Sequence, residues 1–210
     1  MQFDPSHLAR SLMLFAVVAC FLTGCGSWKR FAYEGIGRDW WQQPERVVAA
    51  LELEPGTRIA DLGAGGGYFT FRFSDAVGDG GSVLALDVDP DLTDYVRERA
   101  AREGRGNVTS VLVGPDDPGL QASSVDVIFL SNVYHHLEDR TEYFAGLRGA
   151  LAEGGRVVIV EGKPTGWISW WFGHHTEPEL IRTEMRAAGY DLRVAHDFLS
   201  HQSFQEFVVR

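Results

Sequence analysis

The sequence predicts an α/β domain with a doubly wound, largely parallel sheet, and three observations support this. Short apolar runs alternate with stretches of helical hydrophobic spacing from residue 39 onward, as expected for a parallel sheet with helices on both faces. A glycine-rich loop separates the first apolar run from the helix that follows it. The last two apolar runs follow each other closely, which indicates an antiparallel pair of strands at the sheet edge.

Periodicity and punctuation place each element in order. Pro55-Gly56, the glycine cluster at 78–81, the polar run at 114–124 and Gly154-Gly155 separate the periodic stretches, because such residues favour turns. The spacing predicts helices over residues 39–53, 68–77, 92–103, 142–152 and 178–188, and strands over 58–62, 82–86, 108–113, 125–130, 156–160, 190–194 and 204–209.

Composition narrows the function classes. Hydrophobic residues make up 45% and charged residues 23% of the 210 residues, as in an ordinary globular protein. The formal net charge of -10 repels phosphate backbones, so we expect no nucleic-acid partner. Both cysteines, Cys20 and Cys25, lie near the N-terminus, so the rest of the chain offers neither a disulfide nor thiolate metal ligands.

The N-terminus predicts a targeting signal. Residues 11–24 form an apolar run that is shorter than the roughly 20 residues of a membrane-spanning helix and suits a signal peptide. Leu22-Thr23-Gly24-Cys25 resembles the bacterial lipobox, which implies cleavage before Cys25, lipidation of its thiol, and a membrane-anchored lipoprotein on the periplasmic side of the cell envelope. We therefore expect a signal peptide over 1–24, a connector over 25–38 and the folded domain over 39–210. The alternatives are an uncleaved anchor or a mis-assigned start codon ahead of a cytoplasmic enzyme.

The glycine loop is the strongest ligand signal. Asp61, Gly63, Gly65 and Gly67 lie at the carboxyl end of the first predicted strand, where open α/β sheets bind ligands. The dinucleotide pattern G-x-G-x-x-G/A fails because Tyr68 occupies its last position. An acid at position 61 would repel a pyrophosphate but suits a ligand with an ammonium group. The loop therefore favours S-adenosylmethionine over a nicotinamide dinucleotide, although a nicotinamide-dependent oxidoreductase is a competing hypothesis.

Further acids follow the next two strands. Asp87 ends the second strand, where a carboxylate can accept hydrogen bonds from ribose hydroxyls. Asp116 and Asp117 follow the third strand and are candidates for binding the exocyclic amine of adenine. The alternative is a doubly wound domain whose acids are incidental.

These residues resemble class I S-adenosylmethionine-dependent methyltransferases. Asp61–Gly67 is similar to their D/E-x-G-x-G-x-G motif, and Asp87 matches their ribose-binding acid. Ser131–Leu137 resembles the segment after the fourth strand in the small-molecule, quinone-biosynthesis-like branch, and Asp39–Pro44 resembles a lead-in helix of that branch.

The resemblance covers residues 38–210 and implies a Rossmann-like sheet of seven strands with a reversed terminal strand, S-adenosylmethionine as methyl donor and a small-molecule acceptor. It also places Asn132 in the cofactor site, where close relatives often carry an acid. The N/D-P-P-Y signature of nucleic-acid amino-methyltransferases is absent from this segment.

Tyr134, His135 and His136 follow the fourth strand and lie near the expected methyl position. Where the methyl acceptor must lose a proton, we expect His135 to be the first candidate for the catalytic residue that removes it, and Tyr134 the second. The alternative is a histidine that only packs or caps the next helix. The two His-His pairs, at 135–136 and 174–175, do not predict a metal site, because adjacent side chains diverge.

The segment Trp167–Gly173 is rich in tryptophan. It is expected to line an apolar acceptor pocket, to enter a membrane interface, or to pack over the sheet. The competing function, from another class, is a lipid-anchored, non-catalytic binding or interaction protein on a methyltransferase fold, since the donor is made in the cytoplasm and a signal would export the chain. The sequence does not identify the acceptor or the oligomeric state.

Overall fold

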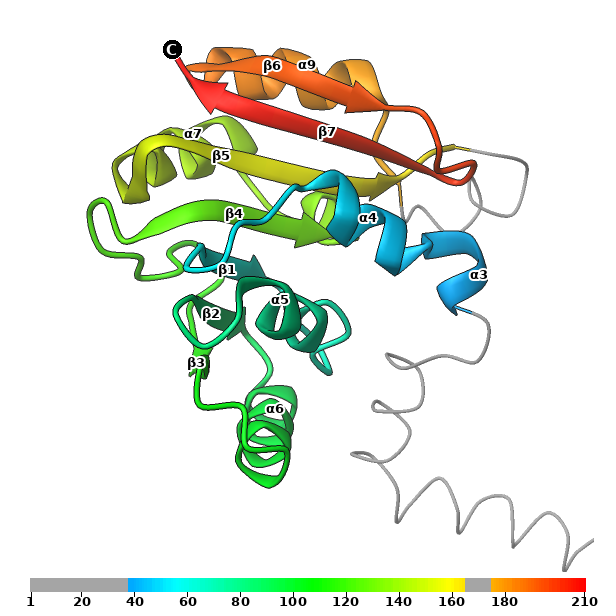
Figure 1. Ribbon diagram of the computed structural model, residues 1–210. Coiled ribbons are helices and arrows are strands. Elements are labelled where there is room, and N and C mark those ends of the chain that lie inside the picture. The colour runs from blue at the N-terminus through cyan, green and yellow to red at the C-terminus, as the bar shows by residue number, and fades with distance from the viewer. Residues whose placement is uncertain (1–37, 165–174) are drawn as a thin grey trace, which may run out of the picture. The chain divides into compact units, whose positions relative to one another are not determined.

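The computed structural model describes residues 38–164 and 175–210, and in this part of the chain seven strands form one sheet. Their order is β3-β2-β1-β4-β5-β7-β6 (Figure 1). The strands are β1 (Arg58–Leu62), β2 (Ser82–Asp87), β3 (Val108–Leu112), β4 (Val125–Ser131), β5 (Leu151–Gly162), β6 (Tyr190–His196) and β7 (Gln202–Val209).

The sheet is parallel except at one side. Strands β1 to β5 pair in parallel, whereas β7 runs antiparallel to both β5 and β6. The predicted reversed terminal strand is thus confirmed, and β7 lies between β5 and the edge strand β6. Because β1 lies between β2 and β4, the chain reverses its winding direction at β1, and the carboxyl ends of these strands form the crevice where such sheets bind ligands.

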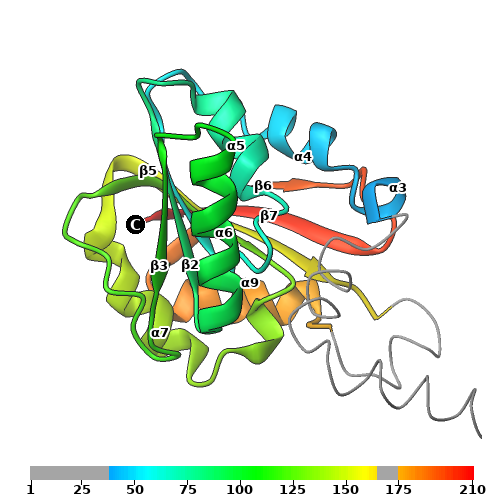
Figure 2. The same ribbon diagram turned by 90° about the horizontal axis from the view of Figure 1, so that it is seen from below.

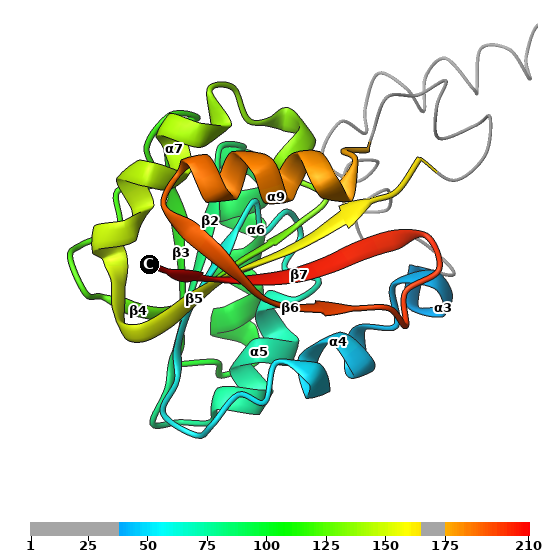
Figure 3. The same cartoon turned by 90° about the horizontal axis from the view of Figure 1, so that it is seen from above.

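Helices cover both faces of the sheet. Helices α4, α5 and α6 lie on one face, and α7 and α9 lie on the other (Figures 2 and 3). The helices are α3 (Arg38–Gln42), α4 (Pro44–Ala50), α5 (Thr70–Val77), α6 (Pro90–Arg102), α7 (Arg140–Leu147) and α9 (Pro178–Ala187), with short 3-10 turns η1 (Tyr134–His136) and η2 (Arg148–Ala150). None of these helices is long and apolar enough to cross a bilayer; the search covered only the described residues.

The predicted first helix is two helices. Gln43 adopts a left-handed conformation with φ 47° and separates α3 from α4, which begins at Pro44. A residue before proline is disfavoured in the right-handed helical region, while proline itself suits the first turn of a helix. The break turns α3 toward the end of the sheet where the parallel strands finish (Figure 1).

The other misplaced boundary lies between α7 and β5. The predicted helix over 142–152 starts at Arg140 and ends at Leu147, and β5 starts at Leu151 rather than at residue 156. Gly154 and Gly155, expected to close the helix, instead lie inside the strand, where the register with β4 shifts. Glycine inside a strand often marks such an irregularity.

Candidate functional site

The predicted cofactor residues come together at the carboxyl ends of β1 and β2. Gly63, Gly65 and Gly67 all have positive φ, at 72°, 55° and 83°, a conformation that favours glycine. The amide of Gly63 donates to the carbonyl of Leu86 (2.8 Å), so the loop after β1 is fastened to the end of β2. A Cβ on Gly63 would overlap the side chain of Val133, which shows how closely the loop after β4 packs on the glycine loop.

Asp87 is held in place by the backbone. One carboxylate oxygen accepts from the amide of Gly65 (2.7 Å), and the other accepts from the amide of Asp89 (2.9 Å). Each carboxylate oxygen has a second lone pair, so the group can still accept from a ligand's hydroxyls. The next residue, Val88, is 58% exposed and offers an apolar surface beside Asp87. The sequence interpretation missed Val88, although an apolar residue directly after the acid was a usable signal.

Asp61 is buried on the other side of the loop. Its carboxylate accepts from the hydroxyl of Thr70 (2.6 Å), and both side chains are almost completely inaccessible. Burial raises the pKa of Asp61 to about 7, an effect that the neighbouring charge of Asp87 reinforces and that Thr70 and Arg38 oppose. A ligand cation at this place would stabilise the ionised carboxylate.

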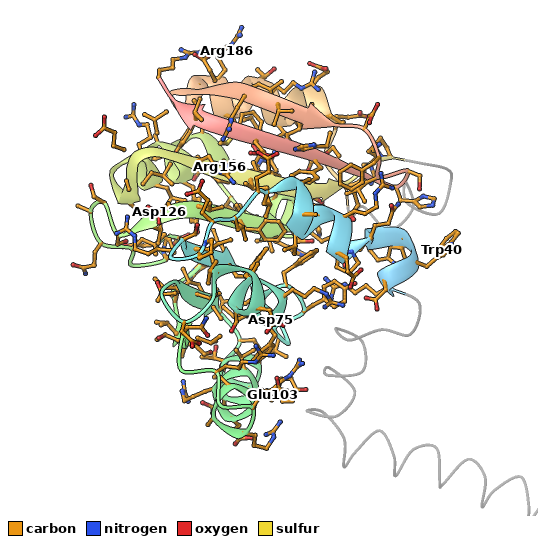
Figure 4. The ribbon with its side chains drawn as sticks, in the orientation of Figure 1. Trp40, Asp75, Glu103, Asp126, Arg156 and Arg186 are labelled. Carbon is orange, nitrogen blue, oxygen red and sulfur yellow. The ribbon has the colours of Figure 1, made fainter. Side chains whose placement is uncertain are left out.

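Helix α3 lies beside the glycine loop. The guanidinium of Arg38 lies 3.8 Å from the centre of the Tyr68 ring, and the hydroxyl of Tyr68 donates to Asp39. The buried amide of Gln42 donates to the hydroxyl of Ser131 at the end of β4 (3.2 Å). Spacing alone did not predict these contacts, because they join residues far apart in the sequence. Trp40, on the same helix, is 80% exposed and points away from the rest of the domain (Figure 4).

The loop after β4 carries the remaining central residues. Asn132 has φ 56°, and its side-chain oxygen accepts from Gln202 at the start of β7 (2.9 Å). His135 places its Nδ1 2.7 Å from a carboxylate oxygen of Glu161, near the end of β5. Glu161 is completely buried. The sequence interpretation missed this acid, because only the sheet order brings β5 beside β4.

Tyr134 is buried beneath the loop after β4. Its side chain is completely buried and stacks on Phe144 with 5.5 Å between ring centroids. Its hydroxyl donates to Glu184 on α9 (2.7 Å), and Arg140 pairs with the same carboxylate (2.8 Å). These contacts hold the ring inside the core, where it packs against α7 and α9, and the catalytic role of Tyr134 stays a prediction.

Asp116 and Asp117 lie in the loop between β3 and β4. They are exposed and line a cavity of about 500 Å³ together with Tyr143 and other residues of α7. The residues that line this cavity include neither the glycine loop nor Asp87. Their adenine-binding role therefore stays a prediction.

A larger cavity of about 810 Å³ opens at the other end of the sheet. Its lining includes Asp126 of β4 and Arg156 of β5 (Figure 4). None of the predicted site residues lies in its wall. We place the site at the carboxyl ends of the strands because topology and the glycine loop agree there.

Three further predictions concern a metal site, Cys25 and the segment Trp167–Gly173. Within residues 38–164 and 175–210, no group of three histidine, cysteine or acidic side chains is arranged to hold a metal. Cys25 and the segment Trp167–Gly173 lie outside the described residues.

Comparison with known proteins shows what the domain is similar to. A family model described as "Methyltransferase domain" matches residues 60–157, which contain the glycine loop, Asp87 and the loop after β4. A solved structure of an S-adenosylmethionine-dependent methyltransferase from Aquifex aeolicus superposes with a TM-score of 0.78 at 19% identity, covering 87% of this chain and 97% of that chain. Residues 60–157 are therefore similar to methyltransferase domains, and the described residues share the Rossmann-like fold of the Aquifex aeolicus methyltransferase.

Curated relatives are similar over the same region. A protein-L-isoaspartate O-methyltransferase from Aeropyrum pernix is 32% identical over 122 residues, covering 57% of this chain and 44% of the relative. A ubiquinone/menaquinone biosynthesis C-methyltransferase from Vibrio campbellii is 28% identical over 135 residues, covering 64% of this chain and 46% of the relative. The chain thus spans about half the length of these relatives.

Proposed function

We propose that this protein transfers a methyl group from S-adenosylmethionine to a small-molecule acceptor. The observation that carries the proposal is the arrangement of Asp61 and Asp87 around the glycine loop. Asp87 is fixed by the amide of Gly65 at 2.7 Å, and Asp61 is buried without a full counter-charge, with a pKa raised to about 7. A doubly wound domain with incidental acids gives no reason to bury one acid and to anchor the other on the same loop.

The residues suit the three parts of this donor. Asp61 would face the ammonium group, Asp87 the ribose hydroxyls, and the exposed Val88 a flat apolar ring. S-adenosylmethionine supplies a methyl group already activated on a sulfonium. The protein then has to align the reacting atoms and exclude water, which the close packing of Val133 on Gly63 supports.

Calorimetric titration of the full chain tests the donor. We expect micromolar binding of S-adenosylmethionine, no binding of NAD, and loss of at least tenfold in affinity in Asp87→Ala. Asp94→Ala is the matched control, because Asp94 is an exposed acid on α6. A folded chain that does not bind the donor would refute the proposal. Binding without turnover of any acceptor would favour the non-catalytic binding protein instead.

We propose a small, non-nucleic-acid acceptor. The net charge of -10 disfavours a polyanionic partner. The names of the two relatives describe an O-methyltransferase and a C-methyltransferase, so they differ in the methylated atom. Production of S-adenosylhomocysteine with a panel of small acceptors and with RNA distinguishes the classes, and a rate with RNA above that with every small acceptor would overturn the proposal.

We also propose a membrane anchor through a lipid on Cys25, with the domain on the periplasmic side of the cell envelope. The apolar run over residues 11–24 and the sequence Leu22–Cys25 support this. Mass spectrometry of the membrane fraction should find a mature chain that begins at a lipidated Cys25, and Cys25→Ser should prevent the modification. An unmodified chain that begins at Met1 would overturn the anchor and favour a cytoplasmic enzyme.

A further inference from the structure

Glu161 and His135 form a buried carboxylate–imidazole pair. Nδ1 of His135 lies 2.7 Å from Oε1 of Glu161, which also accepts from the amide of Gly162 (3.1 Å). The Glu161 side chain is completely buried, and that of His135 is 9% exposed. An ionised carboxylate only accepts hydrogen bonds, so the contact with a Glu161 carboxylate favours the tautomer in which Nδ1 is the donor and Nε2 the acceptor nitrogen.

The other oxygen of Glu161 indicates that the group is more than a packing residue. Oε2 is buried and has no hydrogen-bond partner among the residues that the structure describes. Arg140, on the neighbouring helix α7, interacts electrostatically with Glu161 but is hydrogen-bonded through two nitrogens to Glu184, at 2.8 and 2.9 Å. Burying a carboxylate is costly unless it is paired, so His135 is its principal described partner.

The pair lies on the acceptor side of the predicted donor site. His135 is two residues after Val133, whose side chain packs on Gly63 of the glycine loop. Glu161 lies one strand further along the sheet, because β5 pairs with β4 and β4 pairs with β1. The imidazole is therefore placed beside the end of the sheet where the methyl group would be presented.

We propose that His135, oriented by Glu161, removes a proton from the methyl acceptor. The acceptor class is then a phenol, an enol or an activated carbon acid. Its X–H bond breaks and the proton goes to Nε2 of His135. The electron pair left on the acceptor atom forms the bond to the methyl carbon while the bond between that carbon and the sulfonium sulfur breaks, its electron pair remaining on sulfur. Glu161 is a positioning residue that stabilises the resulting imidazolium. This inference rests on the proposed function.

The tautomer of His135 tests the pair without any acceptor or donor. Nitrogen NMR of the full chain should show Nδ1 protonated in the wild type. A mixture of tautomers is expected in Glu161→Met, which keeps the length of the side chain and removes its charge. The exposed His201 supplies an internal reference that should not change. Protonation of Nε2 in the wild type, or an unchanged tautomer in Glu161→Met, would overturn the pairing.

Acceptor dependence tests the chemistry. Catechol and 1,3-cyclohexanedione lose a proton on methylation, whereas dimethyl selenide has none to lose. We expect His135→Ala to lower kcat/KM for the proton-bearing probes by roughly 10²- to 10⁴-fold, and Glu161→Gln to lower it by about tenfold or more. The rate with dimethyl selenide and the affinity for S-adenosylmethionine should stay unchanged in both variants.

Glu138→Gln is the matched control, since Glu138 is an exposed acid on the same loop. Equal losses with dimethyl selenide would show a merely structural role and overturn the proposal, as would unaltered catechol turnover in His135→Ala. Turnover of dimethyl selenide alone by the wild type would refute the acceptor class. If the donor binds but no probe turns over, the proposed methyl transfer fails, while the tautomer measurement still decides the pair.

Discussion

Substitution of Gly63 by alanine should destabilise the domain and weaken donor binding. Gly63 has φ 72°, and a Cβ there would overlap one γ-methyl of Val133 and lie 3.1 Å from the other. A left-handed conformation costs an L-residue about 1–2 kcal/mol, and overpacking adds about 1–3 kcal/mol. We therefore expect a total loss of about 2–5 kcal/mol in the free energy of unfolding, measured from urea midpoints at constant m-value.

Two controls separate the backbone cost from the steric cost. Gly104 has φ 66° but nothing within 4 Å of its added Cβ, so Gly104→Ala should show only the cost of about 1–2 kcal/mol. A double-mutant cycle of Gly63→Ala with Val133→Ala should give a coupling energy of about 1–3 kcal/mol, because Val133→Ala removes the overlapping methyl. Equal losses at Gly63 and Gly104, together with no coupling, would refute this account.

Three more predictions follow from buried polar groups. The pKa of Asp61 is raised to about 7, and a ligand ammonium requires the ionised carboxylate. The affinity for S-adenosylmethionine should therefore fall by up to about tenfold per pH unit below pH 7. Calorimetry should show that binding releases a proton in this pH range, and Asp61→Asn should remove the pH dependence. The same raised pKa predicts that, without ligand, the free energy of unfolding declines as the pH rises from about 4 to 7 and then levels off, and a flat profile would contradict it. Tyr134→Phe should lower the free energy of unfolding by about 1–3 kcal/mol through the lost hydrogen bond to Glu184, and it should leave turnover unchanged. Loss of turnover in a variant that stays folded would instead support a catalytic role for Tyr134.

The sequence was sufficient to predict the parallel core and to bring together, at one edge of the sheet, the residues that we propose bind the donor. Both depend on local signals: apolar runs define the strands, and the acid and glycines between residues 61 and 67 stand at a strand end. Asp87 was also predictable, because parallel strands end at the same edge and the acid ends the next strand. The hydrogen bond from Gly65 to Asp87 agrees with that expectation.

The acceptor side was less predictable because its contacts are long-range. Glu161 comes 26 residues after His135 in the sequence, and only the pairing of β5 with β4 brings them together. The burial of Tyr134 was not predicted for the same reason, since its partner Glu184 belongs to α9. Residue type and position after a strand did not show that Tyr134, rather than its neighbour His135, would point into the core.

The two sides of the site are coupled through backbone rather than through flexible side chains. Gly63 and Gly65 belong to one loop: Gly65 fixes Asp87 on the donor side, and Gly63 accepts the packing of Val133, which leads to His135. An in-line displacement needs the acceptor atom, the methyl carbon and the sulfur to be aligned, and alignment is the main contribution that a protein makes to an already activated donor. A small displacement of Val133 would move His135 relative to Asp87. The absence of side chains at Gly63 and Gly65 therefore serves alignment as well as close approach of a ligand.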